Sequence, residues 1–151
     1  MIFNPKSFGA KADGSHDDTN AIQQAIDKAF FSGGGRIVLK NGVFLSGTIY
    51  LKSNISLEID ASACLLASPD INSYGSDTHH NRYRNEPELD RCFIFAENAD
   101  NIELCGNGII NGNAEFFPNS NNIYRPMMIR FLNCRNIRLH DLRLYNSAAW
   151  T

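Results

Sequence analysis

The sequence predicts an all-β solenoid whose N-terminal end is closed by one α-helix. Three observations lead to this prediction: a repeated Asn-Ile-x-Leu motif, 18 asparagines among 151 residues, and a helical pattern within the first 35 residues. Recurrence of a motif in one register is typical of solenoids, and asparagine favours the tight turns that join short strands. We therefore expect a single domain over residues 1–151, with the helix at about 17–31 and coils from about residue 36 onward.

The helix is predicted from apolar residues at helical spacing on one face. These are Ala21, Ile22, Ala25, Ile26, Ala29 and Phe30. Asp17 or Asp18 is expected to cap the first turn, because adjacent carboxylates at a helix start do not converge on one substrate as a catalytic pair would. Residues 33–35, three glycines, end the helix. They follow a helix and precede no Lys-Ser/Thr, which argues against a phosphate-binding loop.

The repeat defines the coils. The motif at residues 54–57 recurs at 101–104 and again at 136–139, and the second interval is a shift of 35 residues. The same shift places Asn98 on Asn133 and Asn111 on Asn146. Asn41-Gly42 is a strong turn signal, and the repeat favours a corner between strands of one coil over a hairpin. The polar stretches 68–91 and 112–125 are predicted to be loops inserted between coils, which in solenoids project on one side, often the binding side.

Composition excludes several classes of function. The net charge of −2 argues against a nucleic-acid partner. No apolar run is long enough for a membrane span. The N-terminus lacks the basic residues followed by an apolar run that mark a signal peptide, so a cytoplasmic location is expected. The four cysteines lack a C-x-x-C spacing, and we interpret them as small core hydrophobes, without a metal or cofactor. They are Cys64, Cys92, Cys105 and Cys134.

At this point the residues resemble a known family. The stretches that carry the resemblance are FGAKADGSHDDTNAIQQAID, GGGRIVLKNGVFLSGTIYLKSNISLEID, NIELCGNGIINGN and YRPMMIRFLNCRNIRLHDLRLYNSAAWT, in this order. Together they look like the N-terminal part of a polygalacturonase of glycoside hydrolase family 28, with residues 125–151 the most specific. The opening D-G-x-x-D-D-T is shared more widely among pectin-lyase-like folds and tailspikes. The resemblance implies a right-handed parallel β-helix that hydrolyses α-linked galacturonic acid chains with inversion and without metal.

The resemblance assigns no catalytic residue to this chain. The family's aspartates belong to an Asn-x-Asp, an Asp-Asp, a Gly-His-Gly and an Arg-x-Lys motif, which all lie beyond the stretch that matches NSAAWT. Asn98-Ala99-Asp100 has the letters of the first motif but falls in a turn one coil too early. We therefore expect a β-helix truncated at its C-terminal end and inactive alone. A tailspike-like, non-catalytic polysaccharide-binding β-helix and the product of an interrupted reading frame are the alternatives.

The candidates for contact with a polysaccharide or oligogalacturonide lie mainly in the first loop. They are His79, His80, Arg82, Tyr83 and Arg84. The planar fork of arginine matches a carboxylate in two hydrogen bonds. The alternative is a solvated loop with ion pairs to Glu86, Glu88 and Asp90, and metal binding by the two histidines is less favoured. Arg125 and Trp150 are further candidates: Arg125 has an equally simple structural role, and for Trp150 packing within the coil is favoured over stacking on a sugar.

The C-terminal coil carries alternating apolar residues that no further coil covers. They are Ile137, Leu139, Leu142 and Leu144, and His140 lies among them as a packed or edge histidine. Uncovered apolar side chains and unpaired strand edges favour association. Marginal stability or self-association through this open coil is therefore expected.

Overall fold

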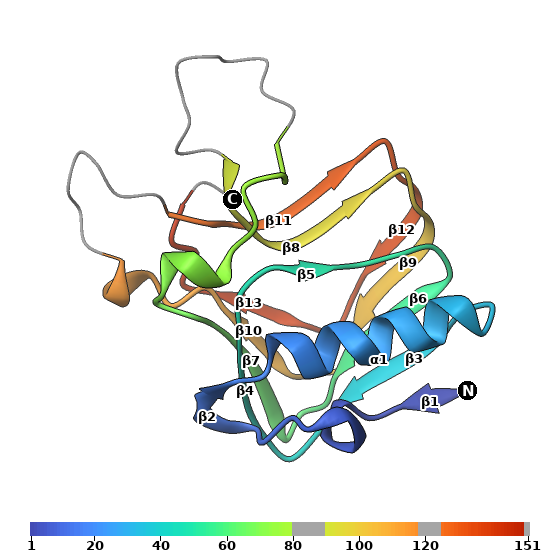
Figure 1. Cartoon of the computed structure of the whole chain (residues 1–151), viewed down its shortest axis with the longest axis horizontal. Coiled ribbons are helices and arrows are strands. Elements are labelled where there is room, and N and C mark those ends of the chain that lie inside the picture. The colour runs from blue at the N-terminus through green and yellow to red at the C-terminus, as the bar shows by residue number, and fades with distance from the viewer. Residues whose placement is uncertain (80–89, 118–124, 150–151) are drawn as a thin grey trace.

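The computed structural model describes residues 1–79, 90–117 and 125–149. The chain folds as a right-handed parallel β-helix (Figure 1). Strands of successive coils pair into three parallel sheets, which form its sides. Sheet A contains β1 (Ile2–Phe3), β3 (Gly35–Leu39), β6 (Ile55–Ile59), β9 (Asp100–Cys105) and β12 (Arg135–Leu139). Sheet B contains β2 (Asp13–Asp17), β4 (Gly42–Ser46), β7 (Ala63–Ala67), β10 (Ile109–Asn111) and β13 (Arg143–Tyr145). Sheet C contains β5 (Ile49–Tyr50), β8 (Cys92–Glu97) and β11 (Met127–Leu132). The predicted fold class is confirmed.

The strand register follows the sequence repeat. Ile55 pairs with Ile102 on β9, and Ile102 pairs with Ile137 on β12, so the repeated motifs stack directly on each other. In sheet B the prediction is wrong by one residue, because Asn111 pairs with Tyr145 and not with Asn146. Between paired positions, the path from Leu139 to Arg143 is one residue shorter than the path from Leu104 to Ile109.

Asparagine is abundant because the corners need a left-handed backbone. Among the described residues, nine asparagines have φ between 51° and 64°: Asn41, Asn54, Asn98, Asn101, Asn107, Asn113, Asn133, Asn136 and Asn146. Asparagine tolerates this conformation better than most residues. The asparagines at one corner also stack their amides over three successive coils. Asn101 Nδ2 donates to Asn54 Oδ1 at 2.9 Å, and Asn136 Nδ2 donates to Asn101 Oδ1 at 3.0 Å.

Asn101 lies at the centre of this amide ladder, and its replacement provides a test. The Asn101→Ala variant loses both ladder hydrogen bonds and places a Cβ-bearing residue that cannot bond locally at φ 61°. We expect the free energy of unfolding to fall by about 1–2 kcal/mol, measured by urea denaturation. Asn101→Gly loses the same bonds without the backbone strain, so it should be the more stable of the two. Equal stability of both variants would show that the conformation does not select asparagine.

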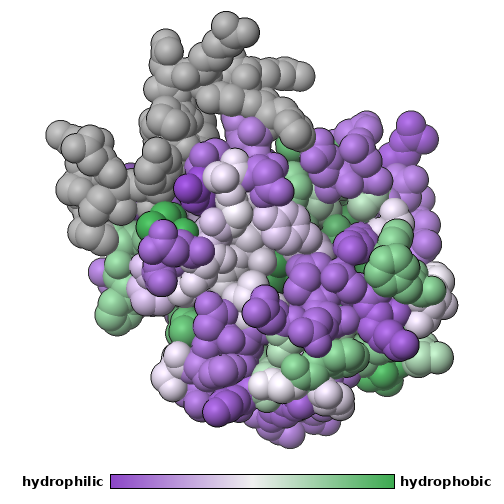
Figure 2. All heavy atoms as spheres, viewed as in Figure 1, coloured by the Kyte–Doolittle hydropathy of each residue, from purple (hydrophilic) through white to green (hydrophobic). Residues whose placement is uncertain are grey.

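One helix, α1 (Thr19–Phe31), closes the N-terminal end of the coils. Its buried side chains are Ala21, Ile22, Ala25, Ile26 and Ala29, and α1 lies against β1, β3, β5 and β6. Phe30, predicted on the same apolar stripe, is instead 38% exposed, with Lys52 Nζ 5.2 Å from its ring centroid. Figure 2 shows the face that carries α1 as mostly hydrophilic, with separate apolar patches. In the described chain α1 is too short to cross a membrane.

Of the two predicted capping residues, Asp17 bonds the first turn of the helix and Asp18 does not. Asp17 ends β2, and its Oδ1 accepts a hydrogen bond from the Thr19 backbone N–H at 2.9 Å. Asp18 holds the N-cap position but makes no side-chain capping bond. Its fully buried carboxylate instead accepts hydrogen bonds from the backbone N–H groups of Lys11 and Ala12, at 2.8 and 2.9 Å. Asp18 therefore ties the segment before β2 to the start of the helix.

The core runs through the coil interior as columns of stacked apolar side chains. Leu57 and Leu104 occupy one column of sheet A, and both are fully buried. Leu139 continues this column on β12 but is 44% exposed. No strand of the described residues stacks beyond β12 or β13, which leaves the last side chain of each column uncovered. The short 3-10 helices η1 (Pro5–Phe8), η2 (Ile71–Ser73) and η4 (Ala114–Phe116) lie outside the sheets.

Candidate functional site

The two long connections both lead from sheet B to sheet C. The first joins β7 to β8, and the second joins β10 to β11. Because β7 pairs with β10 and β8 pairs with β11, the connections leave and re-enter at neighbouring positions in the stack. Figure 1 shows their described ends on one side of the molecule. This side, next to sheet C, is where insertions gather in a solenoid and where a ligand-binding surface is expected.

One row of side chains crosses sheet C on this side. Tyr50, Phe95 and Arg130 occupy the same register position on β5, β8 and β11. In-register residues of parallel strands point to the same face of the sheet. The rings of Tyr50 and Phe95 meet edge to face, with centroids 5.9 Å apart. Sheet C therefore carries two aromatic rings and a guanidinium group in one line, in which Phe95 is buried and Tyr50 and Arg130 are half-buried.

The described start of the first connection folds against this row. Tyr50 Oη donates a hydrogen bond to Asp77 Oδ1 at 2.6 Å, and the Gly75 N–H donates to Thr48 Oγ1 at 3.1 Å. Burial, together with the Asp77 carboxylate, raises the pKa of Tyr50 above its usual value. Tyr50 is consequently a neutral hydroxyl at physiological pH and not a base.

The starts of the two connections pack on each other. The ring centroid of Tyr74, in the first connection, lies 6.3 Å from that of Phe117 in the second and 6.5 Å from that of Phe93 on β8. Tyr74 Oη also donates to the Ser68 carbonyl at 2.7 Å. These aromatic contacts fix both connections at their bases, so groups carried there are held in place by sheet C.

The base of the first connection is closed by polar contacts around Thr78. This fully buried residue donates from Oγ1 to the Asp90 carbonyl at 2.5 Å, and its own carbonyl accepts a hydrogen bond from Arg130 Nη1 at 3.0 Å. Arg91 forms an ion pair with the Asp90 carboxylate. Two guanidinium groups, those of Arg91 and Arg130, therefore lie at the point where this connection returns to sheet C.

Two of the sequence-predicted contact residues lie in the described chain. His79 is half-buried and follows Thr78 directly, whereas Arg125 is exposed and lies two residues before β11. The other candidates lie outside the described residues: His80, Arg82, Tyr83, Arg84 and Trp150. The sequence reasoning missed Arg91 and Arg130. The position of Arg130 beside Phe95 could have been predicted from the repeat, because the 35-residue shift aligns these two residues.

Three described carboxylates near sheet C have structural partners. Asp77 accepts from Tyr50, Asp90 pairs with Arg91, and Asp17 accepts from Thr19 and, at 3.1 Å, from Ser73 Oγ. A glycosidase acid and base must instead face a bound sugar from positions on either side of the scissile bond. Within the described residues, this side therefore supplies aromatic rings and cations and no assigned acid–base pair.

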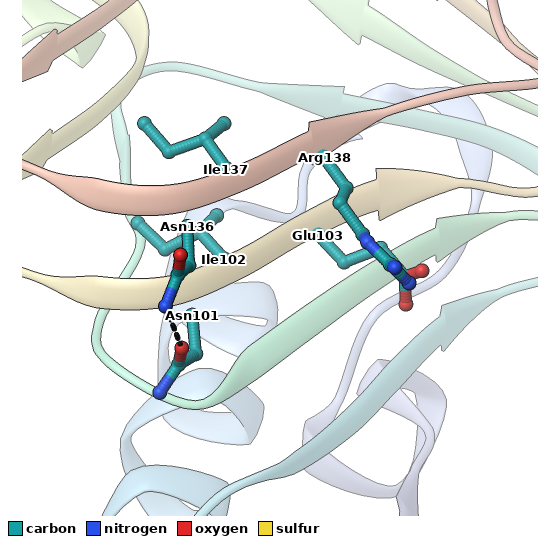
Figure 3. A pocket seen from close by; sticks show the side chains of 6 residues that line it. All are labelled: Asn101, Ile102, Glu103, Asn136, Ile137 and Arg138. Atoms are coloured by element: carbon teal, nitrogen blue, oxygen red, sulfur yellow. Dashed lines mark hydrogen bonds between the residues drawn. The ribbon is translucent and has the colours of Figure 1, made fainter.

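A second polar surface lies on the outside of sheet A. A hollow of about 500 Å³ runs along β9 and β12, lined by Asn101, Ile102, Glu103, Asn136, Ile137 and Arg138 (Figure 3). Glu103 accepts from His140 Nε2 at 2.9 Å and from Ser56 Oγ at 2.7 Å. These hydrogen bonds, first that of His140, lower the pKa of Glu103. His140, predicted within a strand, instead follows β12 and is exposed.

The cysteines divide into two kinds. Cys92 and Cys105 are buried, and the half-buried Cys134 packs against the core, whereas the half-buried Cys64 does not meet the prediction of a core position. Burial raises the pKa of the Cys92 thiol to about 12, so it stays protonated. Among the described residues, one group of side chains could hold a metal ion, namely Glu103, Cys105 and His140.

Comparisons with known proteins identify a family and relatives that this chain resembles. The profile of a family described as "Rhamnogalacturonase A/epimerase, pectate lyase-like" matches residues 2–146. The chain is 36% identical over 121 residues to the exo-poly-alpha-D-galacturonosidase of Dickeya chrysanthemi, which covers 74% of this chain and 19% of that protein. It is 28% identical over 163 residues to a "Probable polygalacturonase" of Vitis vinifera, covering 95% of this chain and 32% of that protein.

A solved structure shows the same fold. The hyperthermoactive exopolygalacturonase of Thermotoga maritima superposes with a TM-score of 0.84 at 24% identity, over 99% of this chain and 43% of that chain. The present chain thus spans between a fifth and a third of the two curated relatives it matches. The matched part includes the N-terminal helix and the coils that carry both long connections.

Proposed function

Because the chain belongs to the rhamnogalacturonase A/epimerase, pectate lyase-like family, as its match over residues 2–146 shows, we propose that it forms the first coils of a glycoside hydrolase acting on pectic or related uronic polysaccharide. The two curated relatives named above, a galacturonosidase and a polygalacturonase, support this substrate class. The proposed reaction is hydrolysis of the O-glycosidic bond with inversion, as the polygalacturonase resemblance implies.

The observation that carries the proposal is the arrangement at the entry of sheet C. Arg91 directly precedes β8, and Arg125 lies two residues before β11. These two strands are paired, and the Met127 N–H donates to the Arg91 carbonyl at 3.0 Å. Arg130 and the half-buried ring of Tyr50 continue from there along the sheet, and the buried Phe95 ring lies against Tyr50. Guanidinium groups suit carboxylates and aromatic rings suit sugar faces. In this proposal the described residues position a uronate chain, and the bond is cleaved by residues outside the described part of the chain.

Residues 1–151 alone are expected to release no reducing sugar from polygalacturonate. The reason is that three described carboxylates near sheet C are already held by Tyr50, Arg91 and Thr19. A reducing-sugar assay on the purified chain measures this directly. Activity that disappears when Asp77 or Asp90 is replaced by Asn would show that the acid and base lie within this chain.

Binding of substrate provides a separate test. Arg125→Ala should weaken the affinity for an oligogalacturonate about fivefold, as loss of one partly solvated ion pair would, in a calorimetric titration at low salt. Arg135→Ala is the matched control, because Arg135 is an exposed arginine on sheet A. Arg82→Ala/Arg84→Ala tests the candidates outside the described residues. Equal affinity of all three variants and the original chain would exclude these arginines from substrate contact.

A non-catalytic polysaccharide-binding β-helix is the second candidate. It is favoured by the structural roles of three described carboxylates near sheet C. The two candidates differ in the full protein: a hydrolase continues into coils that carry the family's aspartates, whereas a binding module does not. Translation of the DNA that follows the codon for Thr151 distinguishes them.

A further inference from the structure

The outside of sheet A carries two rows of polar side chains that end in a cluster of metal-ligand types. Glu103 and Cys105 alternate with the inward-facing Ile102 and Leu104 on β9, so both point outward. His140 follows β12, and its backbone N–H donates to the Leu104 carbonyl at 3.1 Å. The cluster therefore joins two consecutive coils across one strand interface.

The donor atoms of this cluster already lie close together. One ligand atom from each of Glu103, Cys105 and His140 lies within 4.8 Å of the other two. His140 Nε2 and Glu103 Oε1 are 2.9 Å apart. In a tetrahedral zinc site, ligand atoms at bond lengths of about 2.0–2.3 Å are separated by about 3.3–3.6 Å. For a metal ion to bind, the distance between His140 Nε2 and Glu103 Oε1 must increase slightly, and Cys105 Sγ must move closer to both. Side-chain rotations can provide these changes.

The surroundings resemble a prepared site more than a chance surface ion pair. His140 Nδ1 lies 2.8 Å from Asp141 Oδ2, which orients the ring and directs Nε2 toward the cluster, as carboxylate partners do for metal-bound histidines. Ser56 Oγ lies 2.7 Å from Glu103 Oε2 and 3.9 Å from Cys105 Sγ. Two of the three ligands are fixed by the backbone of a strand, which holds their spacing.

We propose that Glu103, Cys105 and His140 form a binding site for a zinc-like divalent cation on the outside of sheet A. Thiolate, imidazole and carboxylate together suit Zn²⁺ better than the hard cations Mg²⁺ and Ca²⁺, which take oxygen ligands. On binding, the Cys105 thiol and the His140 imidazole give up to solvent the protons on their ligand atoms. A water completes the four ligands on the exposed His140 side.

The ion would link β9 to β12. These strands belong to the last two coils of the described chain, and β12 has no partner strand on its other side. A bond from the metal to His140 therefore anchors the terminal coil to the one before it. The site is separate from the polysaccharide surface, which lies at sheet C, so its test does not depend on the proposed hydrolase function.

Spectroscopy with Co²⁺ tests the site in the complete 151-residue chain. After treatment with a chelator, titration with Co²⁺ should produce the thiolate-to-cobalt charge-transfer absorption at one equivalent, and Zn²⁺ should displace it. Cys105→Ser should abolish the band, and Glu103→Gln and His140→Gln should each weaken binding by about tenfold or more. Cys134→Ser is the control, since Cys134 donates to the Leu132 carbonyl outside the cluster, and it should keep the band.

A second measurement avoids dependence on a variant that fails to fold. In the original chain, Zn²⁺ should slow alkylation of Cys105 by iodoacetamide, measured by peptide mapping, without slowing alkylation of Cys64. Saturable binding without a thiolate band, equal affinity of Cys105→Ser, or equal protection of both thiols would each overturn the proposal. Absence of saturable Co²⁺ or Zn²⁺ binding would overturn it as well.

Discussion

Replacement of Asp18 by Ala should lower the free energy of unfolding by about 3–5 kcal/mol, because two hydrogen bonds to a buried carboxylate are lost together. The bonds come from the backbone N–H groups of Lys11 and Ala12, and Asp18 itself has no exposed surface. Without the carboxylate, the Ala12 N–H is left buried with no acceptor. Urea denaturation followed by far-ultraviolet circular dichroism measures the change.

Asp17→Ala is the matched control for this prediction. Asp17 bonds the first helical N–H and the side chains of Thr19 and Ser73 from a more exposed position. Its loss should cost about 1 kcal/mol, as for an ordinary helix cap. If Asp17→Ala proved the more damaging of the two, helix capping would be the main role of this acidic pair and the anchoring role of Asp18 would be wrong.

Leu104→Ala should destabilise the chain by about 2–5 kcal/mol, whereas Leu139→Ala should change its stability by less than about 1 kcal/mol. Both residues occupy the same column of sheet A, and they pair directly across β9 and β12. Leu104 is fully buried, but Leu139 is 44% exposed at the end of the column. Removal of the same atoms therefore leaves a cavity in one case and removes a partly hydrated side chain in the other.

The comparison also reports on association. If the chain associates through its open coil, as the sequence analysis expects, Leu139 is covered by a neighbour, and the cost of Leu139→Ala rises with protein concentration. Sedimentation velocity on the original chain and on Leu139→Lys distinguishes the two cases. A compact monomer of high melting temperature for both proteins would contradict the expected self-association.

The positions of the two long connections were predictable, but the row of side chains on sheet C was not. The repeat predicted that residues 68–91 and 112–125 would interrupt the coils, and the strands that flank them are consecutive in sheets B and C. Arg91 escaped prediction because it belongs to no motif, and Arg130 because the repeat aligns it with an apolar residue, Phe95. What distinguishes Arg130 is the register that aligns it with Tyr50 and Phe95, and a side-chain row across separate strands appears only when the coils stack.

The coil architecture can be predicted from the sequence alone, because the pattern that encodes it is local and recurs in each repeat. Alternating apolar residues fix which side chains face inward, and an asparagine such as Asn101 marks a corner at each turn. The tertiary structure decided what depends on contacts between distant residues. Asp18 has the sequence position of a helix cap, yet its carboxylate accepts hydrogen bonds from the segment before β2. A buried carboxylate needs hydrogen-bond donors, and the backbone N–H groups of this segment supply them. Likewise, Cys105 comes next to His140 only through the stacking of β9 on β12.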